Sequence, residues 1–397
     1  MKKSAIYFGA GLLLLLLLLW VIFHQSQKQE TTPKSVDAKS QTGKHGTASL
    51  PKDSIKDLGK EEDEEVLHSP DPILKAELQT LKSRIAQKPD RETVLRLLQE
   101  FTQKTFSSNP DTAAAALLEF LQSGQDEATG LDFIVGEAGL EEWPSLRAFV
   151  MDLLGKIDLG IASQYVLENV IPVKNSTPEY AVSLRILWDS GGAEEVRPEL
   201  AEAWLGLLQK PDWADQPDAA WMESMDFAGR IPTALPLFVA LATGWLADPE
   251  HATGKAEAAQ LALERAARNH PVETMATLLE NPDWLSQGRG PGIRGSLFAR
   301  ANLADPAQAK MLQRYLSTLD PASRQAVAFA KAFPYRKFSA SPGLSGLPDL
   351  QTPEEIRTSN RAAAEFFRQA LLAGRYPGLK DKITQIQARL NELNRVK

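Results

Sequence analysis

The sequence predicts an all-α protein: a body of helix-hairpin repeats behind a single N-terminal transmembrane helix and a disordered polar tether. Three observations predict this organisation. Residues 5–23 are apolar and uncharged, residues 24–70 are polar and contain no Phe, Tyr or Trp, and apolar residues recur at helical spacing from residue 71 onward. The chain has 397 residues, which is long enough for a sizeable buried core.

Residues 1–23 have the composition of an N-terminal transmembrane signal anchor. The run AIYFGAGLLLLLLLLWVIF would form a helix of about 28 Å, close to the thickness of the hydrocarbon core of a membrane. No A-x-A-like cleavage site follows the run, so we expect the helix to stay attached to the protein. The positions that mark the anchor are Ala5, Leu12, Leu19, Trp20 and Phe23.

The orientation in the membrane is predicted from the short N-terminal tail. Lys2 and Lys3 favour a cytoplasmic N-terminus, although Lys28, Lys34 and Lys39 leave the basic residues on the two sides nearly balanced. The layout is that of an export signal with a very short tail. We therefore expect a single-pass protein of the cell inner (plasma) membrane, with its body on the extracytoplasmic side.

Residues 24–70 read as a disordered tether between the membrane and the body. Their composition, rich in Lys, Ser, Thr, Gln and Asp, does not bury enough apolar surface to offset the entropy of ordering the chain. The acidic run EEDEE at residues 61–65 is either an acidic binding tract or a solvated lead-in to the first helix, and we favour the lead-in.

Residues 71–338 are predicted to form the helical body. Leu74, Leu78, Leu81 and Ile85 show the spacing of one helix face, and similar patterns continue along the segment. Asp-Pro pairs begin at residues 71, 248, 305 and 320, and Pro-Asp pairs begin at residues 89, 110, 211, 217 and 282. In both pairs we expect Asp to cap a helix, and Thr177 and Thr352 to do the same before their prolines.

One junction is written twice in the body. LLQKPDW at residues 207–213 returns as LLENPDW at residues 278–284, which is an offset of about two helix hairpins. In each copy we expect a helix end, a proline stop, an Asp cap and a tryptophan packed on the junction. The region resembles a generic α-solenoid of the HEAT or TPR type, although the TPR consensus is not matched. The resemblance implies a helix-hairpin repeat fold and identifies no specific family.

Residues 339–352 are predicted to form a loop, and residues 353–397 a basic helical hairpin. Its second helix carries an apolar seam with the spacing of a helix-packing face, made of Leu379, Ile383, Ile386, Leu390 and Leu393. The body is acidic and the hairpin is basic, so we expect the hairpin to dock on its own body and cap it. The body is then expected to be mainly monomeric.

Several chemistries are not indicated. The net charge of −7 argues against a nucleic-acid binder, and the absence of Cys removes disulfides and thiolate sites. The five His residues lack the spacing of a zinc site, so neither a metal nor a cofactor is predicted. GPGIRG at residues 290–295 matches the letters of a dinucleotide motif, but we expect a loop between helices. DFIV at residues 132–135 is too short to predict a strand.

Two classes of function remain open. The leading hypothesis is a membrane-tethered scaffold that binds protein partners, and the candidate contact residues are Trp213, Trp284, Arg336, Lys337 and Phe338. The alternative is an all-helical envelope enzyme acting on glycans. Glu223-Ser224 resembles the Glu-Ser pair of lytic transglycosylases, but the Gly-Leu-Met-Gln segment of that family is missing. An α/α-toroid with paired carboxylates is the other enzyme reading. No catalytic residue is assigned, and the balance leans against an enzyme.

Overall fold

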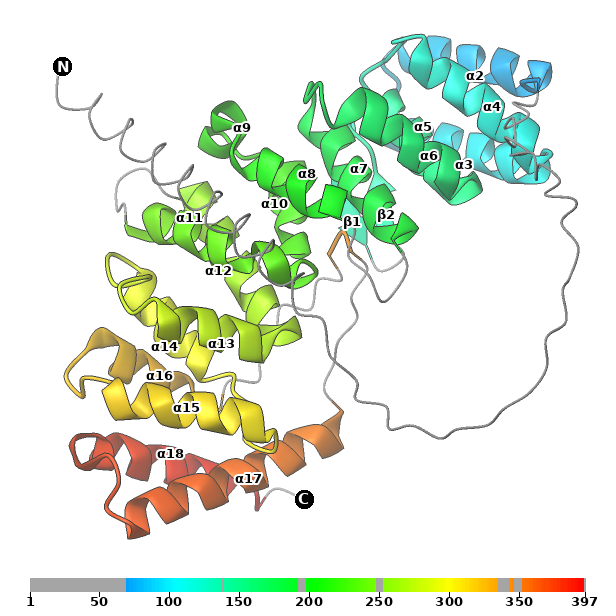
Figure 1. Ribbon diagram of the computed structural model, residues 1–397. Coiled ribbons are helices and arrows are strands. Elements are labelled where there is room, and N and C mark those ends of the chain that lie inside the picture. The colour runs from blue at the N-terminus through cyan, green and yellow to red at the C-terminus, as the bar shows by residue number, and fades with distance from the viewer. Residues whose placement is uncertain are drawn as a thin grey trace, which may run out of the picture. The chain divides into compact units, whose positions relative to one another are not determined.

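The computed structural model describes residues 69–136, 139–191, 198–247, 253–334, 343–345 and 352–395, and these are mostly helical (Figure 1). The predicted transmembrane anchor, with Ala5, Leu12, Leu19, Trp20 and Phe23, lies outside the described residues, as does nearly all of the predicted tether. Within the described part, no single helix has the length and apolarity needed to cross a membrane. One sharply bent pair, Ala219–Gly229 with Pro232–Ala247, passes on length and composition alone.

The first half of the body contains helices and one small hairpin of strands. Its elements are α2 (Pro72–Ile85), α3 (Arg91–Ser107), α4 (Pro110–Gln122), β1 (Ile134–Gly136), β2 (Gly139–Glu142), α5 (Leu146–Ile157), α6 (Leu159–Tyr165), the π-helical turn η1 (Val166–Val170), α7 (Thr177–Ser190), α8 (Pro198–Leu208), α9 (Pro211–Asp215), α10 (Ala219–Glu223) and the 3₁₀ segment η2 (Ser224–Gly229).

The second half is helical throughout its described residues. Its elements are the 3₁₀ turn η3 (Pro232–Ala234), α11 (Leu235–Ala247), α12 (Thr253–Asn269), α13 (Pro271–Glu280), α14 (Gly290–Phe298), α15 (Pro306–Thr318), α16 (Arg324–Ala332), α17 (Pro353–Leu372), the 3₁₀ turn η4 (Pro377–Leu379) and α18 (Lys380–Leu393).

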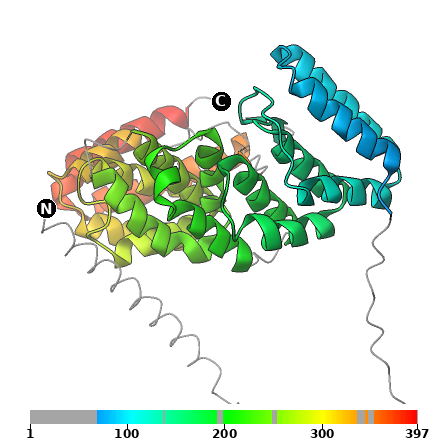
Figure 2. The ribbon, with the colours of Figure 1, turned by 90° about the horizontal axis from the view of Figure 1, so that it is seen from above.

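Helices pack mainly on their neighbours in the sequence. Contacts join α2 to α3 and α4, α4 to α5, α5 to α7, and α7 to α8, and the same pattern continues from α11 to α18. The helices α2–α4, blue to cyan in Figure 2, lie side by side. The predicted apolar face of α2 is the buried one, since Leu74, Leu78, Leu81 and Ile85 all belong to the core. The prediction of an all-α protein is therefore confirmed for the described residues.

Many of the predicted helix caps are present. The carboxylates of Asp71, Asp90, Asp218 and Asp305 accept backbone N–H groups at the starts of α2, α3, α10 and α15. Thr352 forms the predicted capping box with Glu355 at the start of α17. Each cap satisfies N–H groups that have no partner inside the helix, which fixes where the helix begins.

Other cap predictions are wrong by one or more residues. Asn109, and not Asp111, caps α4, and Ser176, and not Thr177, caps α7. In α4, proline takes the first helical position and the capping side chain precedes it, so the Asp after the proline falls within the first turn. Asp320 starts a turn by accepting the N–H of Ala322, and Ser323 caps α16 instead.

The two copies of the repeated junction fold differently, so the expected Asp caps are absent from both. In the first copy Pro211 begins α9, and the residue before it, Lys210, makes no capping hydrogen bond with its side chain. In the second copy residues 282–285 form a turn. There the buried guanidinium of Arg294 donates to four main-chain oxygens, those of Leu278, Asn281, Pro282 and Trp284. The matching letters therefore do not show a structural repeat.

Two local predictions are corrected. Ile134–Gly136 forms a strand that pairs antiparallel with Gly139–Glu142, and the pattern of so short a run does not reveal this pairing. GPGIRG is the start of α14 and not a loop. Its glycines allow close packing, since a Cβ on Gly290 would lie 2.7 Å from the backbone of Leu285, and one on Gly295 would overlap the backbone of α16.

The C-terminal hairpin docks within the chain, as its seam predicts. Helices α17 and α18 pack together, and α18 also contacts α16. The seam residues Leu379, Ile383, Ile386 and Leu390 are buried, whereas Leu393 is 43% exposed, so the seam ends at Leu390. Arg389 donates to the carbonyl oxygens of Ala330, Lys331 and Phe333 at the end of α16. All described residues belong to one compact unit.

Candidate functional site: a buried polar cluster that holds residues 343–345

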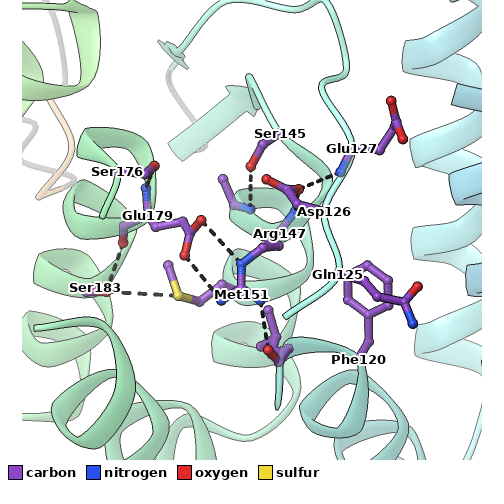
Figure 3. Close-up of polar contacts among 12 residues, drawn as sticks. Phe120, Gln125, Asp126, Glu127, Ser145, Arg147, Met151, Ser176, Glu179 and Ser183 are labelled. Carbon is purple, nitrogen blue, oxygen red and sulfur yellow. Dashed lines mark hydrogen bonds and ion pairs between the residues drawn. The ribbon is translucent and has the colours of Figure 1, made fainter. Parts of the chain in front are cut away.

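Two partly buried polar clusters stand out in the described part of the body. The first is centred on Arg147 of α5 (Figure 3). Its guanidinium faces the Glu179 carboxylate, with Nε 3.3 Å from Oε1, and donates to the Leu121 carbonyl and the Tyr165 hydroxyl at 2.7 and 2.9 Å. Its backbone N–H donates to Asp126. Burial alone would lower the pKa of Arg147. The charge of Glu179, together with the contact to Tyr165, outweighs burial, so the pKa of Arg147 is raised.

The Arg147 cluster has a structural role, because it links neighbouring helices. Nε, Nη1 and Nη2 of the guanidinium all have partners, which join α5 to α7 and to the end of α4. A buried charge whose donors are used in this way rigidifies a fold and leaves little capacity to bind a ligand. We therefore turn to the second cluster.

The second cluster is built on the segment WMESMDFAG, residues 221–229. Asp218 caps α10 by accepting the N–H of Trp221, and the buried Trp221 ring fixes the helix in the core. Trp204 then donates its indole N–H to the carbonyl of Ser224, where α10 passes into η2. These contacts place Asp226 of η2 in the interior, with 1% of its surface exposed.

Helix α12 lies close against η2 and supplies the partner of Asp226. Asn269 donates to the carbonyl of Gly229 at 2.9 Å, and a Cβ on Gly229 would lie 3.1 Å from the carbonyl oxygen of Arg265. A glycine is therefore needed at this close approach. It brings the buried guanidinium of Arg265 onto Asp226 as an ion pair. A buried carboxylate requires such a partner, because desolvation alone would disfavour its charge.

Residues 343–345 reach this cluster from a distant part of the chain. The Ser345 N–H donates to Oδ2 of Asp226 at 2.8 Å, and the Ser345 hydroxyl donates to the same oxygen. Arg230 donates from Nε to the Ser345 hydroxyl oxygen at 3.1 Å and from Nη2 to the Ser345 carbonyl at 3.0 Å. Leu344 is 2% exposed and belongs to the hydrophobic core. The backbone and the hydroxyl of Ser345 are thus both bound.

Charge and burial shape the surroundings of the cluster. The Arg230 guanidinium also lies 4.5 Å from the centre of the Trp188 ring of α7. Burial raises the pKa of the Glu223 carboxyl, and the charge of Arg265 opposes this shift. Burial lowers the pKa of His270 at the end of α12, opposed by Glu273. The cluster therefore combines two carboxyl groups with two guanidinium groups in a region of low solvent access.

Two of the five predicted contact residues, Trp213 and Trp284, belong to the described residues. Trp213 is half-buried, with its ring 5.4 Å from that of Tyr180 and 3.8 Å from Nζ of Lys210. Trp284 is also half-buried and packs against the core. Arg336, Lys337 and Phe338 lie outside the described residues. Most of the tryptophan surface thus serves helix packing, and Trp204 and Trp221 are fully buried.

Other candidate chemistries find internal partners. Ser224, of the Glu223-Ser224 pair, is buried, and its hydroxyl donates to the Ala220 carbonyl. Arg294 and Arg300, near the glycine motif, bind main-chain oxygens and Glu264 respectively. Among the described residues, no group of three or more His, Asp or Glu side chains is arranged to hold a metal ion.

The comparisons with known proteins add no constraint. Neither family models, nor curated proteins, nor solved structures gave a match to this chain. The candidate site therefore depends on geometry alone. Sequence reasoning missed Asp226, Arg230, Arg265 and Ser345, because the partners lie up to 119 residues apart and form no local motif.

Proposed function

We propose that the chain is a membrane-tethered scaffold of helix-hairpin repeats whose body binds protein partners at the cell envelope. The observation that carries the proposal is the set of hydrogen bonds between the body and Ser345, in the segment of residues 343–345. There the body binds a short turn of the chain through the main-chain N–H and C=O groups of Ser345, by means of Asp226 and Arg230. Contacts to main-chain groups with a pocket for one side chain are a general mode of peptide recognition.

The N-terminal sequence supports the membrane part of the proposal. The uncharged run of residues 5–23 is long enough for one membrane helix, and its layout favours an extracytoplasmic body. A flexible tether with the length of residues 24–70 would give the body a reach of roughly 35–40 Å. A tether of this kind suits a binding body that meets its partners close to the membrane.

The outer face of α2 and α3 offers a surface for such a partner. A hollow of about 530 Å³ is lined by residues of both helices, including Leu74, Glu77, Glu100 and Lys104. Ile73, at its edge, is 70% exposed, and a large exposed aliphatic residue beside a hollow is suited to contact with another protein. The charges around the hollow have both signs, so a partner with mixed charge fits it.

Site-specific photo-crosslinking in cells tests the proposal. A photoreactive residue at Ile73 of the full-length chain should crosslink to a discrete protein, whereas one at the similarly exposed Val327 of α16 should give far less product. A reporter fused after Lys397 should be active outside the cytoplasm. Absence of any crosslinked protein from Ile73, or reporter activity only in the cytoplasm, would contradict the proposal.

One observation favours a second function, an all-helical envelope enzyme acting on glycans. Burial raises the pKa of the Glu223 carboxyl, and a raised carboxyl pKa is a property of the general acid in glycoside hydrolysis. The purified chain should then release soluble fragments from isolated cell-wall glycan, and Glu223→Gln should abolish the release. Equal release by wild type and variant, or no release by either, would remove this candidate.

A further inference from the structure

The cluster around Asp226 has the properties of a site for an exchangeable peptide. Its contacts to residues 343–345 use the backbone N–H, the carbonyl and one hydroxyl of the bound segment, together with a buried position for Leu344. Two of the receptor side chains, Asp226 and Arg265, are buried ions. Arg265 pairs with Oδ1 of Asp226, which leaves Oδ2 to accept both the N–H and the hydroxyl of Ser345.

The site selects a narrow class of peptide. Gly343 has a φ of +68°, which favours glycine, and a Cβ there would overlap Arg265 and Asp226. The second position must be apolar and of leucine size, because Leu344 is part of the core. The third must carry a hydroxyl, since that group donates to Asp226 and accepts from Arg230.

We propose that Asp226, Arg230 and Arg265 form a recognition site for peptides of the form glycine–aliphatic–serine in a turn conformation, and that residues 343–345 occupy it as an intramolecular ligand. This inference rests on the proposed function, since it names the chemistry of a partner segment for the binding body. A partner that presents the same tripeptide displaces residues 343–345.

A labelled peptide tests the site directly. The probe is a fluorescein-labelled heptapeptide with the sequence SPGLSGL of residues 341–347, and its binding to the full-length chain in detergent is followed by fluorescence anisotropy. Wild type should bind weakly, because a tethered ligand competes at an effective concentration in the millimolar range. Leu344→Asp places a charge at a core position and releases the tethered segment. Affinity for the probe should then rise about tenfold or more.

Three controls define the recognition. Gly343→Val is a second way to release the segment, because its side chain would overlap Arg265, and it should raise probe affinity in the same way. Asp226→Asn, added to Leu344→Asp, should lower probe affinity about tenfold through loss of charge-assisted hydrogen bonds. A probe in which aspartate replaces the leucine should not bind to any variant.

Each outcome decides the proposal. It fails if Leu344→Asp and Gly343→Val keep their helical circular dichroism but bind the probe no better than wild type. It also fails if both variants unfold, because residues 343–345 would then be a fixed part of the core, or if Asp226→Asn leaves probe binding unchanged. Loss of probe binding alongside intact crosslinking from Ile73 would reject the peptide site and leave the proposed scaffold function standing.

Discussion

Replacing Arg294 by methionine tests how the body closes one of its helix junctions. Arg294 is only 5% exposed. Its guanidinium donates to the carbonyl oxygens of Leu278, Asn281, Pro282 and Trp284 at 2.6 to 3.1 Å. Methionine has a similar length but no donor. The Asn281 carbonyl still accepts the N–H of Trp284. The other three carbonyl oxygens lose their donor at about 1 kcal/mol each, and relief from burying a cation offsets part of this, so we expect a net loss of about 2 kcal/mol.

The assay is urea unfolding of the full-length chain in detergent, followed by far-ultraviolet circular dichroism. Arg314→Met is the matched control, because Arg314 is exposed on α15 and should lose less than about 0.5 kcal/mol. Arg294→Lys keeps the charge but not the planar arrangement of donors. Its loss of unfolding free energy should therefore lie between those of Arg294→Met and Arg314→Met. A loss at Arg294→Met no larger than that of the control would refute the role assigned to this side chain.

Three further changes test the helix starts, the aromatic packing and the C-terminal hairpin. Asp305→Ala should cost about 1 kcal/mol in unfolding free energy. The pKa of Asp305 is held below its usual value by hydrogen bonds from Gln308 and Ala307. The stability that the carboxylate contributes is therefore present above about pH 4 and is lost as the pH falls through the folded-state pKa. Equal losses of unfolding free energy at pH 7 and pH 2 would refute this. Trp284→Ala should cost about 3 kcal/mol, because the half-buried ring packs on the core, and a negligible loss in the same assay would instead support an exposed binding aromatic. Truncation after Ala373 removes α18 from α16 and α17, so it should lower the thermal midpoint without changing the mass measured by sedimentation; a dimer that becomes a monomer would show an oligomer interface.

Features encoded by neighbouring residues were predicted well from the sequence. The buried face of α2 follows from the spacing of its four large aliphatic residues, because helical periodicity is a local property. The capping box of Thr352 and Glu355 is likewise set by residues three apart. The packing of the C-terminal hairpin on itself and on α16 was also predicted, since an apolar seam requires a partner surface.

Features that depend on partners outside a residue's own helix or strand were not predictable. The two PDW junctions share their letters but differ in outcome, because Arg294 binds the second turn whereas Pro211 begins a helix in the first. The strand at Ile134–Gly136 exists only through its pairing with Gly139–Glu142. Asp226 and Ser345 are 119 residues apart, and nothing in the local sequence of either marks their contact.

The most direct test of the account is the hydrogen exchange of a single amide. The account holds that the body binds residues 343–345 at Asp226, and there the Ser345 N–H donates to the carboxylate at 2.8 Å. In the wild-type chain this amide should exchange at least about a hundredfold more slowly than in a free peptide, and Leu344→Asp should remove the protection. Exchange of the wild-type Ser345 amide at the free-peptide rate, while the amides of α12 remain protected, would contradict the account.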